Sequence, residues 1–440
     1  MSRVRQPTRA AVPLALAWTV LAVGLALCAP VHAQPSYQRC EDSIGQVLDV
    51  IDARLALMPG VAAYKWQHHL PVADPPRERV VIEQAVSAGH PLGFAAAPLR
   101  ALFAFQIALA RARQEALQAH WRRRGFDAPA VPSDLQSSLR PQLDALTLRL
   151  LRSLYRAAPV LRSGQFSAQA LALARARLTA PAWSEASRSD LIAHLAAIRL
   201  EAAPALERVR ASGVLRIGTP GDYAPFSLER AGSLEGMDIV LAEQLARALG
   251  VQPLFVRTSW RTLLPDLRAD AFDMAVGGIS ATAERAAAGA LSRAYLHGGK
   301  VLLVHCTEAR RFDTLAAVDS PQVRVVENAG GTNEQFARRE LTHAHLTVVA
   351  HNARALDVLL QGAAQVMVTD DTEAALQSLL HPELCRSGAG LVTRADKVVL
   401  MAPDPALKRA VDGWLGEQLS AGRPRQWLQA QLSRAAAPAR

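Results

Sequence analysis

The spacing of apolar residues changes near residue 213, and this change constrains the fold of the 440-residue chain more than any other feature. Before it, apolar residues recur three and four positions apart, as in Ile44, Val47, Leu48, Ile51 and Leu55. This spacing places them on one face of an α-helix. After it, short runs rich in valine, isoleucine and leucine alternate with helical runs. The two patterns predict an all-α domain followed by an α/β domain.

Prolines separate the helical runs of the first half, and no run there alternates like a strand. In the second half, the alternation of strands and helices predicts largely parallel sheets. The predicted strands are 214–217, 253–256, 274–276, 301–304, 323–326, 346–349, 366–368 and 397–401, and two of the predicted helices are 239–249 and 353–360. We predict four segments, which are a leader at 1–33, an all-α domain at 34–203, a linker at 204–212 and an α/β domain at 213–435.

The first 33 residues have the pattern of a secretory signal peptide. Three arginines fall within the first nine residues, an apolar run spans 12–29, and small residues stand at positions 31 and 33. A retained anchor is the alternative, but the apolar run contains Pro13 and is short for a span of about 20 residues. We therefore expect a chain exported to the periplasm or secreted, without stable membrane anchoring.

The charge balance is basic but spread along the chain. The formal charge of +10 becomes +7 when the three arginines of the leader are removed. An anionic small molecule suits this balance as well as nucleic acid does, and export argues against nucleic acid. No spacing of histidines or cysteines indicates a metal site.

Three cysteines follow the leader. Cys306 and Cys385 lie in the same half and can pair in an oxidising compartment. Cys40 is then left as a free or an intermolecular thiol.

Lysine is rare, since only four of the 49 basic residues are lysine. Where lysine persists, the chemistry can require a compact ammonium rather than a planar guanidinium, although chance retention is the alternative. Lys65 belongs to a set of polar residues on separate predicted helices. Cations from separate helices that face one cavity typically bind carboxylates. The alternative is that these residues are charges scattered over the surface. The set is Arg54, Lys65, Asp74, Arg77, Glu78, Gln114 and Arg140.

Residues 41–200 resemble the secreted, single-chain class of helical chorismate mutase. The resemblance is carried by Ile51-Asp-Ala-Arg54-Leu, Val61-Ala-Ala-Tyr-Lys65-Trp66, Asp74-Pro-Pro-Arg77-Glu78, Phe103-x-x-Gln106-Ile107, Gln114 and Leu139-Arg140, in order and spacing. It implies an exported mutase that converts chorismate to prephenate.

The resemblance also implies roles for these residues. Arg54 and Arg140 clamp the substrate carboxylates, with Arg77 in the same cationic wall. Lys65 and Gln114 face the ether oxygen whose C–O bond breaks. By the same resemblance, Glu78 accepts the hydroxyl hydrogen bond and Asp74 supports the turn. The order Asp74-Pro-Pro by itself predicts that Asp74 is the N-cap of the next helix. The chain departs from the family at Ala110, where a short polar residue is usual, so one hydrogen bond to a carboxylate is missing.

The second half resembles periplasmic solute-binding proteins for polar amino acids. The matching segments are 213–227, 234–242, 273–285 (with Ser280, Thr282 and Arg285) and Thr369-Asp370. The implied fold has two α/β lobes, with the ligand in the cleft between them. Binding proteins and a few enzymes share this fold, so fold alone does not decide the function.

Glu334 favours an enzyme over a receptor. It follows Gly330-Gly331-Thr332-Asn333, whose amides suit an anion at a helix N-terminus. A glutamate beside that site repels an anionic ligand, but when protonated it can act as a general acid. This segment resembles cyclohexadienyl dehydratase, as do Thr258-Ser259-Trp260, Tyr295-Leu-x-Gly-Gly-Lys300, His381-Pro-Glu-Leu-Cys385 and Asp396-Lys397.

The resemblance implies that Glu334 donates the proton. The side-chain carboxylate binds Arg285 with Thr282 and the Thr332 amide, and Lys300 and Lys397 are candidates for the ring carboxylate. Tyr223 and Trp260 wall the ring, although a core role is the alternative for Trp260. Asp370 holds an arogenate amine, and Ser280 and Asn333 complete the binding set.

We therefore predict a bifunctional exported enzyme that makes phenylpyruvate from chorismate. Its substrates are chorismate, prephenate and arogenate, and the reactions need no cofactor and no metal. The alternative is a periplasmic amino-acid-binding receptor that carries a helical interaction domain. The choice between prephenate and arogenate, and homo-oligomer formation, stay open.

Overall fold

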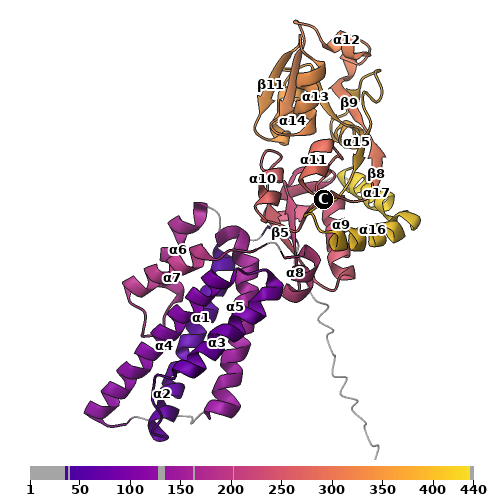
Figure 1. The fold of residues 1–440 in the computed structure, drawn as a ribbon. Helices are drawn as coiled ribbons and strands as arrows, with labels where there is room; N and C mark the ends of the chain where they lie inside the picture. Colours follow the sequence, from indigo (N-terminus) through magenta and orange to yellow (C-terminus); the bar gives the residue numbers. More distant parts are fainter. Residues whose placement is uncertain (1–34, 38–39, 127–133, 162–163, 202, 437–440) are drawn as a thin grey trace, which may run out of the picture. The chain divides into compact units, whose positions relative to one another are not determined.

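The computed structural model describes residues 35–37, 40–126, 134–161, 164–201 and 203–436 (Figure 1). The predicted signal peptide at 1–33 lies outside the described residues. Within these ranges, no helix has both the length and the apolar character needed to cross a membrane.

The first half is all-α, as predicted. Helices α1 and α5 pack against each other, and α3 packs against α4. The apolar residues of α1 that recur three and four positions apart are buried, including Ile44, Val47 and Leu48. No strand occurs in the described residues between 40 and 200. The elements are α1 (Cys40–Ala56), α2 (Met58–Gln67), α3 (Pro75–Gly89), η1 (His90–Leu92), α4 (Ala96–Arg124), η2 (Leu135–Leu139), α5 (Arg140–Leu161), α6 (Gly164–Arg177) and α7 (Glu185–Ala197).

Asp74 begins α3, as the sequence predicts. Its Oδ1 accepts a hydrogen bond from the Arg77 backbone N–H at 3.2 Å. Glu78 reaches back to accept the Asp74 backbone N–H at 3.3 Å. This reciprocal pairing satisfies two donors that the helix end leaves free. It also fixes where Arg77 and Glu78 leave the helix.

The segment predicted as a linker is mostly helical. Helix α8 (Ala205–Ser212) buries Leu206 and Val209, and Gly213 ends it with φ of 69°. A left-handed backbone at that position suits glycine. The change of pattern near residue 213 therefore corresponds to the end of α8 and the start of the first strand.

The second half contains two five-stranded sheets, with strand orders β5-β1-β6-β15-β7 and β11-β10-β12-β9-β13. The strands of these sheets are β1 (Val214–Thr219), β5 (Gln252–Arg257), β6 (Met274–Ala275), β7 (Ala290–Leu291), β9 (Lys300–His305), β10 (Arg324–Asn328), β11 (His345–Val349), β12 (Val366–Asp370), β13 (Leu384–Arg386) and β15 (Leu400–Met401). Smaller sheets comprise β2 (Asp222–Tyr223), β3 (Ser227–Arg230) and β4 (Ser233–Glu235), and β8 (Leu296–Gly298) with β14 (Ala395–Lys397).

The sheets are mixed, whereas the sequence pattern predicted largely parallel ones. Strand β1 pairs in parallel with β5 and β6, but β15 is antiparallel to both of its neighbours. In the other sheet, β10 makes parallel pairs and β9 makes antiparallel pairs. The parallel pairs follow from helical crossovers. The single strand predicted at 397–401 is split between β14 and β15, which lie in different sheets.

The helices of the second half cover these sheets (Figure 1). Their bounds are α9 (Met237–Ala248), α10 (Leu263–Arg268), α11 (Ala283–Ala288), η3 (Cys306–Glu308), α12 (Leu315–Val318), α13 (Thr332–Glu340), α14 (Asn352–Leu360), α15 (Asp371–Leu380), α16 (Pro405–Ser420) and α17 (Arg423–Ala436).

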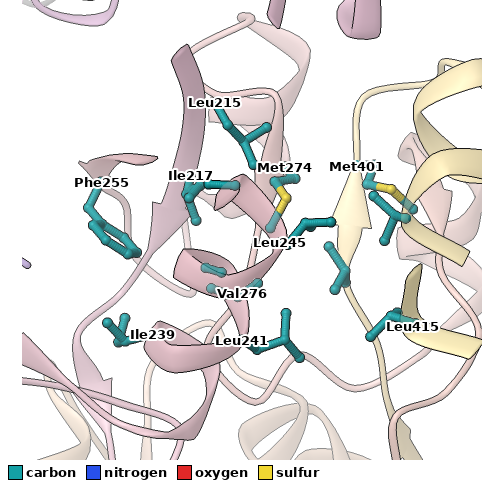
Figure 2. Close-up of a cluster of buried hydrophobic side chains, with 14 of the residues drawn as sticks. Leu215, Ile217, Ile239, Leu241, Leu245, Phe255, Met274, Val276, Met401 and Leu415 are labelled. Atoms are coloured by element: carbon teal, nitrogen blue, oxygen red, sulfur yellow. The ribbon is translucent and has the colours of Figure 1, made fainter. Parts of the chain in front are cut away.

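One apolar core lies around β1 and α9 (Figure 2). Leu215 and Ile217 of β1 and Leu241 and Leu245 of α9 are fully buried in it. Burying such side chains contributes roughly 1.5–3 kcal/mol each. This core holds the carboxyl end of β1 in place, and strand β2, which follows β1 in the chain, carries Tyr223.

Cys306 and Cys385 form a disulfide, as predicted, with Cα atoms 4.8 Å apart. Cys306 directly follows β9 and Cys385 lies on its antiparallel partner β13, so the bond joins neighbouring chain segments. The prediction for the Cys40 thiol lies outside the described side chains.

Candidate active sites

The helical half contains a cavity of about 180 Å³. All seven polar residues singled out in the sequence line it, and they come from α1, α2, the start of α3, α4 and the start of α5. They are Arg54, Lys65, Asp74, Arg77, Glu78, Gln114 and Arg140. Scattered surface charge is therefore not the correct interpretation of this set.

The charges that line this cavity favour a dianion. Five cations line it, since Arg111 joins the four predicted ones, and three carboxylates line it, since Asp144 joins Asp74 and Glu78. The formal balance is +2. Apolar side chains form much of the remaining wall, including Leu55, Val61 and Leu109.

Lys65 lies on α2, near the carboxylates of Asp74 and Glu78. Its Nζ donates to the Val72 carbonyl at 2.7 Å, which leaves two ammonium hydrogens for a ligand. Partial burial lowers the pKa of Lys65, against the opposing effect of the Asp74 and Glu78 carboxylates. The ammonium is thus held by one carbonyl and balanced by nearby acids.

Arg54 is fixed by neighbours that the sequence did not identify as site residues. Its Nε donates to Gln106 Oε1 at 3.2 Å, and its Nη1 donates to the Leu143 carbonyl at 3.0 Å and Thr147 Oγ1 at 2.6 Å. Burial lowers the pKa of Arg54 to about 10, against the effect of Asp144. Among the described residues, none accepts a hydrogen bond from Nη2, so this donor pair is available to a carboxylate.

Gln114 is buried and only half satisfied. Its Nε2 donates to the Ala110 carbonyl at 3.3 Å, but its Oε1 has no hydrogen-bond partner within the described part of the chain. A buried polar atom without a partner is uncommon in proteins. Ala110, which replaces the polar residue usual in the mutase family, also lines the cavity.

The α/β half contains a second, much smaller cavity of about 20 Å³. It lies beside the carboxyl ends of β10 and β12 and the start of α13. The lining residues are Tyr223, Trp260, Gly278, Ser280, Arg285, Asn328, Gly331, Thr332, Asn333 and Asp370. A ligand with a six-membered ring is larger than this space, so it requires the cleft to open.

Asp370 lies within a buried ionic network. Its Oδ2 pairs with Lys397 Nζ and accepts the Tyr223 hydroxyl hydrogen bond. Lys300 Nζ lies 3.9 Å from Oδ1 and donates to Thr332 Oγ1 at 3.0 Å. The pKa of Asp370 is lowered because the two lysines outweigh the opposing effect of burial. The amine-binding role of Asp370 stays a prediction, since Lys397 already occupies one carboxylate oxygen.

Lys300 and Lys397 are buried, with exposed fractions of 5% and 4%. Neither lines the cavity directly, but each donates to residues that do. Lys397 donates to the Gly278 carbonyl at 2.8 Å and to Ser280 Oγ at 3.0 Å. Burial lowers the pKa of Lys300 to about 8, against the opposing effect of Asp370.

Arg285 presents a buried guanidinium to the cavity. Its Nη1 donates to the Ser280 carbonyl at 2.7 Å, and its Cζ lies 5.9 Å from the centre of the Trp260 ring. Burial lowers the pKa of Arg285 to about 10. Thr282 does not line the cavity. Its Oγ1 accepts the Arg285 backbone N–H at 3.2 Å, so Thr282 caps α11.

Trp260 belongs both to the cavity wall and to the edge of two apolar cores. Its indole N–H donates to Asp222 Oδ1 at 3.0 Å. Burial raises the pKa of this carboxyl group, against the effect of the indole hydrogen bond. Asp222 stands inside the 213–227 segment, but the sequence indicated no role for it, because its contact with Trp260 joins residues 38 positions apart.

Glu334 lies beside the cavity but does not line it. Its Oε2 accepts the Gly330 backbone N–H at 2.6 Å, and its Oε1 accepts from Arg338 Nε at 2.9 Å. The carboxylate is 16% exposed. It follows Thr332 and Asn333, which line the cavity, but its two oxygens accept hydrogen bonds from residues that do not line it.

The fold and the two sites define a two-domain chain, in which a helical domain with a cationic cavity precedes a two-sheet domain of the solute-binding type. Residues 45–115 match the family described as chorismate mutase type II. Residues 215–427 match bacterial extracellular solute-binding proteins, family 3.

Two curated relatives divide the chain between them. The cyclohexadienyl dehydratase of Pseudomonas aeruginosa is 41% identical over 245 residues, which cover 54% of this chain and 91% of that protein. The monofunctional chorismate mutase of Enterobacter agglomerans is 30% identical over 159 residues, which cover 36% of this chain and 84% of that protein. The chain belongs to the chorismate mutase family in its helical part and to the cyclohexadienyl dehydratase family in its α/β part.

Among solved structures, the α/β part is similar to an amino acid ABC transporter substrate-binding protein from Streptococcus pneumoniae bound to L-arginine. The identity is 26%, the TM-score is 0.50, and the match covers 52% of this chain and 98% of that chain. This likeness agrees with the two-lobed fold predicted from the sequence.

Proposed function

We propose that the chain is a bifunctional enzyme that rearranges chorismate to prephenate and then converts prephenate, or arogenate, to phenylpyruvate, or phenylalanine. The observation that carries the first activity is the lining of one cavity by seven polar residues of the mutase motifs, with a formal balance of +2. The second activity rests on 41% identity to a cyclohexadienyl dehydratase over 91% of its length.

The mutase reaction is a unimolecular rearrangement, so positioning and charge stabilisation are sufficient for catalysis. The arginines Arg54, Arg77 and Arg140 hold the two carboxylates of chorismate and select its compact conformer. As the ether C–O bond breaks, negative charge develops on its oxygen, and the ammonium of Lys65 stabilises that charge. Gln114 acts at the same oxygen.

The dehydratase reaction removes water and carbon dioxide from the ring. Glu334 donates a proton to the ring hydroxyl, which leaves as water. The bond to the ring carboxylate breaks, its electron pair enters the ring, and the ring becomes aromatic. Arg285 binds the side-chain carboxylate, while Lys300 and Lys397 supply positive charge for the ring carboxylate. The proton is consumed once per turnover, so atoms and charge balance.

An amino-acid receptor with a helical module is the alternative class of function. The fold of the α/β part is compatible with it, because solute-binding proteins share that fold. The buried Lys300 and Lys397 argue against it. Together with Arg285 they make three cations, which is more than one amino-acid carboxylate needs.

We further propose that the chain is exported to the periplasm or secreted. The support is the signal-like composition of the first 33 residues and the match to a family of extracellular proteins. Mass spectrometry of the protein recovered from the periplasmic fraction tests this, and a start at residue 34 is the expected result.

The dehydratase assignment is tested with prephenate as the substrate and two matched variants. Glu334→Gln keeps the hydrogen-bonding shape but cannot donate an acidic proton, so we expect at least 10²-fold lower formation of phenylpyruvate. Asp222→Asn changes the carboxyl group that accepts the Trp260 indole hydrogen bond, and we expect a loss of less than tenfold. Chorismate consumption should be unchanged in both.

The opposite ranking would transfer the acid role from Glu334 to Asp222 and leave the activity assigned. No phenylpyruvate from the unmodified chain, together with tight binding of an amino acid, would support the receptor instead.

A further inference from the structure

The connection between α6 and α7, residues 178–184, forms part of the mutase cavity wall. Trp183 lines the cavity, and it is the single aromatic residue among the described residues that do so. Ala180 and Ala182 pack with it in an apolar cluster that contains Leu55 and Met58 of the cavity wall. This connection lies beyond residues 45–115, the part that matches the mutase family model.

A single carboxylate on α1 holds this connection. Asp52 Oδ1 accepts the Trp183 indole N–H at 2.7 Å and the Ala180 backbone N–H at 3.1 Å. Asp52 Oδ2 accepts the Thr179 backbone N–H at 3.1 Å and its hydroxyl at 3.0 Å. The four hydrogen bonds to this one carboxylate fix both the backbone of the connection and the orientation of the indole ring.

The position of Asp52 relates this anchor to the cavity. Leu55 lines the cavity three residues further along α1, and residues three apart lie on the same side of a helix. The connection is also tied from the other side, because Arg188 of α7 donates to the Leu178 carbonyl at 3.0 Å. The backbone of the connection is therefore held from both α1 and α7, while the indole N–H is held by Asp52.

We propose that Trp183 is a substrate-contacting wall of the mutase cavity and that Asp52 is the positioning residue that holds it there. This inference rests on the proposed mutase function. An apolar ring at this wall limits the volume open to the substrate and so favours the compact conformer from which the rearrangement proceeds. The arginines bind the two carboxylates of the substrate. The indole ring of Trp183 therefore contacts the uncharged part of the substrate.

The test measures kcat and KM for chorismate in a small set of variants. Trp183→Ala should lower kcat/KM roughly tenfold, the size expected for one lost apolar contact with a substrate. Asp52→Ala should lower it by about three- to tenfold through the misplaced ring. Asp52→Asn retains one acceptor oxygen and should be milder than Asp52→Ala.

Asp49→Ala is the matched control. Asp49 also lies on α1, and its carboxylate pairs with Arg177 of α6 at 3.0 Å. Among the described residues, it makes no hydrogen bond to the 178–184 connection. We expect its kcat/KM to stay within about twofold of the unmodified chain.

The double variant distinguishes a positioning role from general destabilisation. If Asp52 acts through Trp183, Asp52→Ala should have less than about a twofold further effect in the Trp183→Ala background, because the two effects are coupled. A full, multiplicative loss in that background would overturn the positioning role. Trp183→Phe, which keeps a ring but loses the N–H, provides a milder variant if Trp183→Ala fails to keep the helical circular dichroism signal.

The two failures are distinguishable. No chorismate turnover by the unmodified chain would overturn the mutase assignment and this inference with it. Normal turnover by the unmodified chain, combined with unchanged kcat/KM in both Trp183→Ala and Trp183→Phe, would overturn the inference alone.

Discussion

At the residue scale, the four lysines show how much a rare residue type can predict. Lys65 lines the first cavity, and Lys300 and Lys397 lie buried around the second. Lys408 makes a surface ion pair with Asp412 and belongs to neither site. Three of the four positions therefore carry a buried or half-buried ammonium next to acidic groups. The sequence indicated these three by rarity and motif, and could not exclude the fourth by rarity alone.

Replacing Lys65 should remove most of the mutase activity. Lys65→Gln keeps a hydrogen-bond donor of similar length but no charge, so the oxygen of the breaking bond loses its cation. We expect a fall in kcat of roughly 10²–10³-fold, the cost of removing one preorganised donor for a developing negative charge. Turnover of prephenate should be unchanged. Lys408→Gln is the control, and a comparable loss in it would contradict the assignment of Lys65.

The dehydratase should lose activity at alkaline pH through Lys300. The pKa of Lys300 is about 8, so the group is an ammonium below that pH and becomes neutral as pH rises through it. Binding of a carboxylate needs the ammonium, so kcat/KM for prephenate should fall above about pH 8. This ratio reports ionisations of the free enzyme. In Lys300→Met, the remaining activity should lack that alkaline limb, and an unchanged limb would assign it to another group.

For some residues the sequence indicated no role, although Asp52 and Gln106 stand within the mutase motifs. Thr147 and Gln106 fix Arg54, and Asp52 fixes Trp183, across separations of 52 to 131 positions along the chain. Their types are common on helix surfaces, and only tertiary packing gives them a role. Motif spacing therefore predicted the charged groups that face the substrate but missed the residues that orient those groups.

At the element scale, capping and periodicity were predictable where the signal is local. Asp74 was identified as an N-cap from the order Asp-Pro-Pro, and it caps α3. The apolar residues predicted to share one helix face are buried in α1, and the bounds of strands β1, β5 and β12 lie within two residues of the predicted ones. Sheet direction depends on contacts between distant segments, so the antiparallel pairing of β9, β13 and β15 was not predicted.

Removing the cap of α3 should affect both stability and mutase activity. Asp74→Ala leaves the Arg77 backbone N–H unpaired and should lower the free energy of unfolding of the helical part by about 1 kcal/mol. The mutase kcat/KM should also fall, because Arg77 and Glu78 shift with the helix start. Thr314→Ala removes an N-cap in the α/β part, where Thr314 Oγ1 accepts the Ala317 N–H. It should leave the mutase kcat/KM unchanged, and equal loss in both variants would contradict the link between the cap and the site. Thermal unfolding followed by circular dichroism and chorismate kinetics measure the two effects.

At the scale of the whole molecule, two catalytic domains in one chain have a chemical logic. The product proposed for the helical domain is the substrate proposed for the α/β domain, and both sites favour acidic ligands because they carry buried cations. The fold class and the order of the domains followed from periodicity, since a 3.6-residue period and strand–helix alternation are strong signals over long segments. The closed state of the second cavity did not follow, because it depends on side-chain packing across the cleft.

The account is tested most directly by giving chorismate alone to the purified chain and following three compounds over time. We expect chorismate to disappear, prephenate to rise and fall as a transient, and phenylpyruvate to approach one mole for each mole of chorismate, at neutral pH and without acid treatment. The central claim would be contradicted if prephenate accumulated in full and became phenylpyruvate only on acidification, or if chorismate were not consumed faster than in buffer.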